Sequence, residues 1–152
     1  MEGTRLSPRV RLVVAIGFPG SGKSTYFASI GANAVSSDLL RRWLADDETD
    51  QRINGRVFAA AEYLVRQRLE LGRPVTYVDA TNLTRGDRRT WIRLARSMGV
   101  RVEALWFDVP VTVCKARNEA RERQVPAYVL DMMASKFVPP SVEEGFDEVV
   151  KW

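Results

Sequence analysis

The segment Gly17-Phe18-Pro19-Gly20-Ser21-Gly22-Lys23-Ser24-Thr25 follows directly on the apolar segment Val10–Ile16. The apolar segment is rich in β-branched residues, which is typical of a central parallel strand buried on both faces. After the glycine-rich segment, Tyr26–Ile30 is expected to be helical and to stop near Gly31. A strand, a glycine-rich loop and a helix in this order predict a phosphate-binding loop at the end of a central strand.

The spacing Gly17-x-x-x-x-Gly22-Lys23-Ser24 is the Walker A pattern. The backbone N–H groups of such a loop point inward and surround phosphate oxygens. Lys23 is expected to reach the β- and γ-phosphates of a nucleotide, and Ser24 to hold Mg²⁺. A chance glycine turn before a helix is the alternative, and the register of strand, loop and helix argues against it. The expected nucleotide-binding residues here are Gly17, Pro19, Gly20, Ser21, Gly22, Lys23, Ser24 and Thr25.

Strand and helix patterns alternate along the rest of the chain. Further strands are expected at Ala34-Val35, Val75–Val78 and Val100–Phe107, with Phe146–Trp152 as a last strand or tail. Helices are expected at Leu39–Leu44, Ile53–Leu71, Thr112–Arg123, Val129–Phe137, and between a capping box at Thr84 and Asp87 and a stop at Gly99. This alternation predicts a single α/β domain over residues 1–152, with a parallel sheet covered by helices on both faces.

The composition excludes several kinds of chemistry. The 152 residues include 23 Lys and Arg, 19 Asp and Glu, one Cys and no His. Without histidine, Ser-His and Cys-His nucleophiles and histidine metal sites are excluded. Cys114 alone cannot form an internal disulfide or a multi-thiolate zinc site, which fits a reducing compartment. The net charge of +4 is a mild indication of an anionic partner.

No segment predicts a membrane partner. The early apolar run Leu12–Ile16 is far shorter than the roughly 20 residues that span a bilayer, and it lacks the pattern of a signal peptide. A soluble cytoplasmic protein is expected.

Asp38 follows the second expected strand, and Arg41 lies three residues later. At the start of a helix these two positions share a face. In phosphoryl transfer a carboxylate can accept the proton of the attacking hydroxyl, and an arginine beside it can bind another anion on the acceptor. The alternative is an N-cap aspartate with a surface arginine, and the spacing leaves both interpretations open.

Asp79 stands at the carboxyl end of the strand Val75–Val78, on the sheet edge where ligands bind in open α/β folds. It could hold magnesium or its waters, or it could instead fix a loop or orient an arginine. Thr81 and Asn82 are expected to be turn and cap residues.

Arginines are frequent late in the chain. Arg117 and Arg121 are four residues apart on an expected helix, so both can reach one target, and Arg123 follows. Cations over a transferring phosphoryl group can raise the rate by roughly 10³–10⁵. We therefore expect a helical lid around residues 112–127. An exposed helix face balanced by Glu119 and Glu122 is the alternative.

Several expectations concern packing. The stripe of Ile53–Leu71 is expected to contain Phe58, Ala61, Val65 and Leu69. The next helix should bury Trp91, Leu94, Ala95 and Met98. Its opposite, solvent-exposed side should carry Arg88, Arg89, Arg93 and Arg96, with contact to a nucleic-acid backbone as the alternative. Core or groove-wall positions are expected for Trp43, Trp91 and Trp106, and Cys114 should be small buried packing.

Five blocks in this order resemble the 5′-kinase domain of polynucleotide kinases, especially the kinase module of bacterial RNA end-healing and repair enzymes. The blocks are residues 17–25, 35–41, 46–51, 78–82 and 117–126. The resemblance extends from about Leu12 to beyond Val138. The Walker pattern is shared by many unrelated kinases, whereas the ordered combination is much more specific.

This resemblance implies a P-loop kinase three-layer sandwich with a central parallel sheet and a helical lid. It implies that Lys23 and Ser24 bind the phosphates of ATP, or of another nucleoside triphosphate, together with Mg²⁺. Asp38 would be the general base for a 5′-hydroxyl, and Arg41 would hold the acceptor's own phosphate. Arg117 and Arg121 would be lid residues on the ATP phosphates, and Asp79 matches the acidic residue of the family's strand-end block.

The expected activity is ATP-dependent phosphorylation of the 5′-OH end of DNA or RNA. Lys23, Asp38, Arg41 and Arg121 would act in catalysis, and Asp38, Arg41 and Asp79 would contact the acceptor. No residues support a 3′-phosphatase or ligase activity. The alternatives are a kinase for a nucleoside, sugar or antibiotic, and an ATP-binding switch without an acceptor. Arg41 favours an acceptor that already carries a phosphate, and Asp38 argues against the switch.

Overall fold

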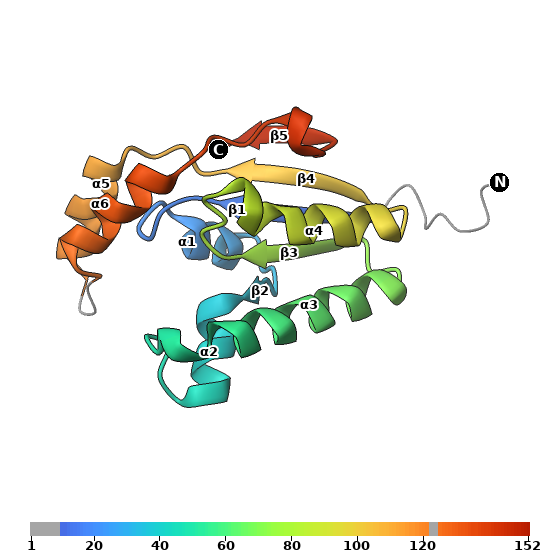
Figure 1. The fold of residues 1–152 in the computed structure, drawn as a ribbon, viewed down its shortest axis with the longest axis horizontal. Coiled ribbons are helices and arrows are strands. Elements are labelled where there is room, and N and C mark those ends of the chain that lie inside the picture. Colours follow the sequence, from blue (N-terminus) through green and yellow to red (C-terminus); the bar gives the residue numbers. More distant parts are fainter. Residues whose placement is uncertain (1–9, 122–124) are drawn as a thin grey trace.

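A five-stranded parallel sheet forms the centre of the molecule (Figure 1). The computed structural model describes residues 10–121 and 125–152. The strands are β1 (Arg11–Ile16), β2 (Val35–Ser36), β3 (Val75–Asp79), β4 (Arg101–Trp106) and β5 (Glu148–Lys151). Their order is β2-β3-β1-β4-β5, and all four neighbouring pairs are parallel. The strand that leads into the glycine-rich loop is therefore the central one, as the sequence predicts.

Six α-helices connect the strands within the described residues. They are α1 (Lys23–Ser29), α2 (Ser37–Ala45), α3 (Asn54–Glu70), α4 (Arg85–Ser97), α5 (Val111–Glu119) and α6 (Ala127–Lys136). Short 3₁₀ helices occupy Gln51–Ile53 and Val142–Glu144. The boundaries agree with the predicted elements to within a few residues, and both residues of the predicted capping box at Thr84 and Asp87 make their hydrogen bonds.

The alternation of side chains along β1 separates two cores. Leu12, Val14 and Ile16 face the larger core, to which α3 and α4 contribute. Val13 and Ala15 face the smaller one, which α1 covers through Phe27. The result is the predicted three-layer arrangement with helices on both faces of the sheet.

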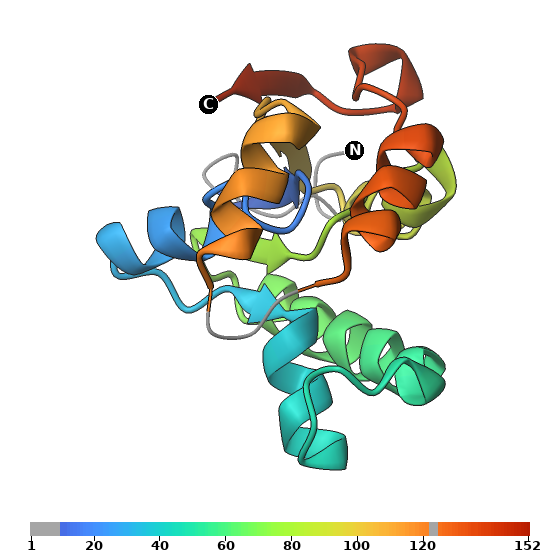
Figure 2. The ribbon, with the colours of Figure 1, turned by 90° about the vertical axis from the view of Figure 1, so that its left-hand side faces the viewer.

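The helices α5 and α6 lie together beyond the carboxyl ends of the strands, as the view from that side shows (Figure 2). A third cluster, which includes Phe18 of the glycine-rich loop, Leu83 and Cys114, packs them there. An ion pair of 2.8 Å between Lys115 and Asp131 also joins the two helices. This position places α5 and α6 next to the glycine-rich loop.

Two packing predictions need correction. In α3 the buried stripe is Val57, Ala61, Val65 and Leu69, whereas Phe58 is partly exposed. The regular four-residue spacing starts one residue earlier than predicted, and a step of one residue turns a side chain about 100° around a helix. Trp43 is also exposed, because it lies on the outer side of α2.

Arg88 is a larger correction, because it is completely buried rather than on the exposed side of α4. It precedes Trp91 by three residues and Ile92 by four, so it shares their buried face. Its Nε and Nη2 donate to the two carboxylate oxygens of Glu144 at 2.8 and 2.9 Å. Its Nη1 donates to the backbone carbonyls of Asn82, Leu83 and Val138. The guanidinium thus joins the loop after β3 to the chain segment after α6.

We expect Arg88→Met to lower the free energy of unfolding by about 3–5 kcal/mol, because it leaves the Glu144 carboxylate buried without its partner. Urea unfolding followed by circular dichroism measures this loss. Arg89→Met, at an exposed position on the same helix, should stay within about 0.5 kcal/mol of the parent. Glu144→Gln combined with Arg88→Met should recover part of the loss. Equal stability of the Arg88 and Arg89 variants would contradict a structural role for the buried pair.

Candidate active site

The glycine-rich loop connects β1 to α1 and depends on two glycines with positive φ. Gly22 precedes α1 at φ 101° and Gly20 lies at φ 85°. A Cβ on Gly20 would also come within 3.0 Å of the backbone oxygen of Cys114 in α5. Cys114 is fully buried there, as predicted for a small packing residue. The loop and α5 are therefore in direct contact.

Lys23 is the buried charge of this loop. Its ammonium donates to the carbonyl oxygens of Gly17 and Phe18 at 2.8 and 3.1 Å. Burial lowers the pKa of Lys23, and the carboxylates of Asp79 and Asp38 oppose this shift. Ser24 and Thr25 follow in the first turn of α1 with exposed side chains. The lysine is thus held close to two acidic residues from other strand ends.

Asp38 lies in the first turn of α2 but does not cap it. The N-cap is Ser36, whose hydroxyl accepts the N–H of Leu39. The Asp38 carboxylate is 78 % exposed and accepts from Nη1 of Arg41 at 2.9 Å. The interpretation of Asp38 as an N-cap is therefore wrong, and its carboxylate is open to a ligand.

Arg41 is buried beneath Asp38, with a side-chain exposure of 5 %. Besides Asp38, it donates through Nη2 to Oδ1 of Asn54 at 2.8 Å and through Nη1 to the carbonyl of Glu48 at 3.4 Å. Its Nε is buried and has no hydrogen-bond partner among the described residues. The interpretation of Arg41 as a surface arginine is wrong. Asn54, which lies 13 residues later in the chain, orients the Arg41 guanidinium. No sequence pattern identified Asn54 as a residue of the site.

Asp79 ends β3, and its carboxylate forms no hydrogen bond or ion pair with any residue that the structure describes. Burial raises its pKa, and the Asp38 charge acts in the same direction, while the Lys23 ammonium lowers it. Asp79 therefore neither orients an arginine nor closes a loop. A half-buried carboxylate without such a partner, close to a lysine, is a candidate for binding a cation or a substrate group.

The loop after β3 has a structural role. Asn82 is buried with φ 49°, and its amide donates to the carbonyl of Ala15 at 2.8 Å. Its side-chain oxygen accepts from the indole N–H of Trp91 at 3.2 Å. The backbone carbonyl of Thr81 accepts the N–H of Gly17 at 3.1 Å. The predicted turn residues thus fasten the end of β3 to the glycine-rich loop.

Arg117 lies in the last turn of α5, whereas Arg121 lies two residues beyond the end of this helix at Glu119. The prediction that one helix carries both arginines is therefore wrong. Nη1 of Arg117 donates to the carbonyl of Gly20 at 3.1 Å. Arg121 is exposed, and its charge contributes to the lowered pKa of Lys23. Asn118 is buried and bonds the backbone of Val125 in both directions, which closes the loop between α5 and α6. Arg123 lies outside the described residues.

The donor atoms around Lys23 fit a hard cation bound together with a nucleotide. Among the described residues no group of three or more His, Cys, Asp or Glu side chains could hold a metal by itself. Mg²⁺ does not need such a group, because it is usually bound by one or two protein oxygens, substrate phosphates and water. The Ser24 hydroxyl and the Asp79 carboxylate are oxygen ligands of this kind.

The sequence model of a family described as an AAA domain matches residues 12–140, which include the whole site. The chain belongs to this family. It is a P-loop kinase domain with the parallel sheet and glycine-rich loop that the resemblance implied.

Known relatives of this kinase domain act on different acceptors. It is 28% identical to a bifunctional polynucleotide phosphatase/kinase of Schizosaccharomyces pombe, over 94% of this chain and 33% of that protein. It is 24% identical to an L-seryl-tRNA(Sec) kinase of Methanococcus maripaludis, over 90% of this chain and 56% of that protein. The chain thus spans between a third and somewhat more than half of these relatives.

Among solved structures, the Pnkp1/Rnl/Hen1 RNA repair complex contains a chain of the same fold. The TM-score is 0.71 at 18% identity, with 84% of this chain and 43% of that chain covered. In the described part of the kinase domain, no helix is both long and apolar enough to cross a membrane.

We expect Lys23→Met to raise the melting temperature of the nucleotide-free protein at pH 7 by roughly 2–4 °C, which corresponds to about 1 kcal/mol. Folding lowers the pKa of Lys23. The charged lysine therefore reduces the free energy of unfolding at pH values below that lowered pKa. The unfolded state binds more protons between the lowered pKa and 10.5, and the parent should therefore gain stability over the variant as the pH rises through this window.

Differential scanning fluorimetry from pH 7 to about 10 measures both effects. Lys136→Met, at an exposed lysine of α6, is the matched control and should follow the parent at every pH. A lower melting temperature for Lys23→Met at pH 7 would mean that Asp79 and Asp38 more than compensate for the burial of the ammonium.

Proposed function

We propose that this domain is an ATP-dependent polynucleotide 5′-hydroxyl kinase. The observation that carries the proposal is the exposed Asp38 carboxylate, held from below by the buried Arg41 and close to Lys23. A carboxylate that is exposed, oriented and not used as a helix cap suits a general base for an incoming hydroxyl. The similarity to a polynucleotide phosphatase/kinase over 94% of the chain supports this choice of acceptor.

In the proposed reaction the 5′-oxygen of the acceptor forms a bond to the γ-phosphorus, and the bond from that phosphorus to the ADP oxygen breaks. Asp38 takes the proton of the 5′-hydroxyl. Lys23 lies in the loop where it can neutralise charge on the transferring group. Ser24, with Asp79 nearby, would hold Mg²⁺, and this ion would supply further neutralisation of phosphate charge.

The lid arginines have distinct positions relative to the nucleotide site. Arg117 is bonded to the loop backbone at Gly20, so it would both shape the loop and face the phosphates. Arg121 is exposed but close enough to affect the pKa of Lys23. We propose that Arg121 contacts the γ-phosphoryl group of the bound nucleotide.

Arg41 has a double role in this proposal. It fixes the Asp38 carboxylate through Nη1 and is itself fixed by Asn54 through Nη2. Its unpartnered Nε leaves one donor for an anion of the acceptor. A phosphate next to the 5′-terminal nucleoside is such an anion, and a neutral sugar does not provide one.

We expect Asp38→Asn to lower kcat for phosphorylation of a 5′-OH oligonucleotide by at least about 10², because general-base catalysis contributes 10²–10⁴. The Kd for ATP, measured by calorimetry, should change less than about threefold, since Asp38 lies outside the glycine-rich loop. Asp46→Asn, at an exposed aspartate at the other end of α2, is the control. Transfer by Asp38→Asn at the rate of the parent would exclude this residue as the base.

A transfer assay with γ-labelled ATP tests the acceptor class. We expect labelling of 5′-OH DNA or RNA oligonucleotides and of a mononucleoside 3′-phosphate, and at least about tenfold weaker labelling of a nucleoside without a phosphate, since that acceptor cannot engage Arg41. Seryl-tRNA, gluconate and an aminoglycoside complete the panel. Labelling of one of these three without labelling of any 5′-OH nucleic acid would assign another substrate to the kinase.

A further inference from the structure

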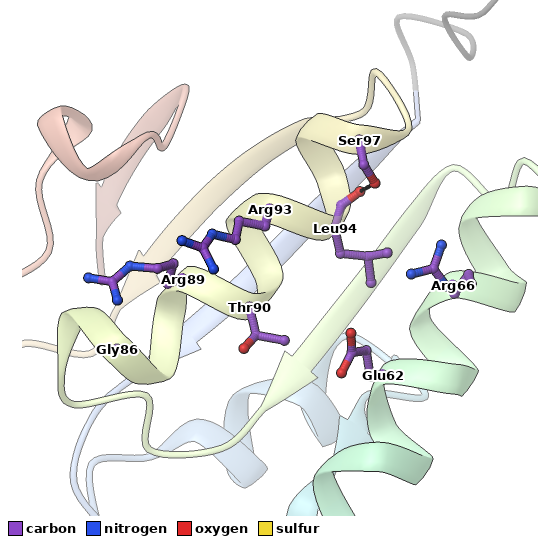
Figure 3. A pocket seen from close by; sticks show the side chains of 8 residues that line it. All are labelled: Glu62, Arg66, Gly86, Arg89, Thr90, Arg93, Leu94 and Ser97. Carbon is purple, nitrogen blue, oxygen red and sulfur yellow. Dashed lines mark hydrogen bonds between the residues drawn. The ribbon is translucent and has the colours of Figure 1, made fainter.

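A groove of about 480 Å³ runs between α3 and α4, outside the nucleotide site (Figure 3). Arg66 and Glu62 line it from α3, and Arg89, Thr90 and Arg93 line it from α4. Figure 3 shows the side chains of the two helices on opposite sides of this hollow. Three arginines and one glutamate line this hollow, so its lining carries a net positive charge. In Figure 3, Arg66 lies on the α3 side, and the guanidinium groups of Arg89 and Arg93 extend from α4 on the side away from α3.

These three arginines are not used by the fold. Arg66, Arg89 and Arg93 are exposed, and none of them makes a hydrogen bond or ion pair with a residue that the structure describes. Two other arginines of α4 differ in this respect. Arg88 is buried on Glu144, and Arg96 pairs with the carbonyl of Gly145 and with Asp147. Charges left unpaired in a concave surface favour an anionic ligand.

Both walls of the groove begin at the catalytic edge of the sheet. The helix α3 starts at Asn54, which bonds the Arg41 that holds Asp38. The helix α4 starts at Arg85, six residues after Asp79. From this edge the groove extends toward the amino ends of the strands. A chain whose end lies at Asp38 can therefore continue between α3 and α4.

The spacing of the arginines suits a repeating anion. Arg89 and Arg93 are four residues apart on α4, which is about 6 Å along the helix axis. Each can therefore meet a different phosphate, and Arg66 can approach from the opposite wall. Guanidinium groups bind phosphates in a bidentate manner. None of the described residues that line the groove is aromatic. Base stacking would therefore not contribute, and binding would not depend on the base sequence.

We propose, building on the polynucleotide kinase function proposed above, that the α3–α4 groove binds the phosphates of the acceptor strand behind its 5′ end. The kinase would then hold the terminal nucleotide at Asp38 and Arg41 and the following phosphates at Arg66, Arg89 and Arg93. Acceptors long enough to reach the groove would bind more tightly than a mononucleotide.

Fluorescence anisotropy with a 12-nucleotide 5′-OH strand, labelled at its 3′ end, tests the groove independently of catalysis. We expect Arg89→Gln/Arg93→Gln to weaken binding roughly tenfold at low salt. It should also reduce the slope of log K against log salt by about 1.4, which corresponds to two phosphate contacts on a single strand. Glu62→Gln should tighten binding, because it removes the negative charge from the groove.

The matched control is Arg73→Gln/Lys136→Gln, which removes the same charge from exposed positions that do not line the groove. It should keep the affinity and the salt slope of the parent. Circular dichroism and the melting temperature verify that each variant is folded. Equal weakening by the groove and control variants would overturn the assignment, because net charge alone would then explain the binding.

Transfer kinetics distinguish failure of the groove from failure of the proposed function. For the groove variant, the ratio of the KM for the 12-nucleotide strand to the KM for a mononucleoside 3′-phosphate should rise roughly tenfold. If the parent labels 5′-OH strands but the groove variant keeps its ratio and salt slope, only the groove inference fails. If the parent labels no 5′-OH acceptor, the proposed function fails, and the anisotropy measurement still decides whether the groove binds nucleic acid. Anisotropy with a labelled polyglutamate peptide tests a different occupant. If the groove variant loses polyglutamate binding but keeps the strand affinity of the parent, the groove binds an acidic protein segment instead.

Discussion

The site depends on a lysine ammonium that is buried in the glycine-rich loop. Lys23 is held by two carbonyl oxygens of its own loop, and the nearest compensating charges, Asp79 and Asp38, belong to other strand ends. Removal from water is the largest influence on its pKa. A buried ammonium is stabilised by an anion that brings several negative oxygens into the loop. Burial of Lys23 thus carries a desolvation cost that the negative charge of a phosphate group would offset.

The order of the strands determines which groups surround that lysine. Because β1 lies between β3 and β4, with β2 beyond β3, the ends of the first three strands in space carry Asp38, Asp79 and the glycine-rich loop side by side. All five strands are parallel, so these ends lie on one edge of the sheet. The two lid helices then cover the same edge through contacts of Cys114 and Arg117 with Gly20. The Asp38 carboxylate, the glycine-rich loop and Arg117 thus come from segments up to about a hundred residues apart.

Arginine serves three different purposes in this fold, and its surroundings distinguish them. Arg88 is fully paired in the core and holds two connections together. Arg41 is buried but keeps one donor unpartnered beside an exposed carboxylate. Arg66, Arg89 and Arg93 are unpaired around a groove that starts at the same edge. Only the first of these is explained by stability alone, and the other two are where anionic ligands are expected to bind.

The amino-acid sequence by itself determined the parallel α/β fold, the nucleotide-binding loop and the strand-end positions of Asp38 and Asp79. These features depend on local order, since a buried strand, a glycine-rich loop and a helix succeed one another within 20 residues. Only the tertiary structure decided that Arg88 is buried, that Ser36 rather than Asp38 caps α2, and that Asn54 orients Arg41. A helical pattern separates two faces of a helix but does not state what lies opposite each face. Arg88 pairs with Glu144, and Arg66 and Arg93 line the same hollow. No local spacing encodes these relations, because the packing of distant segments creates them.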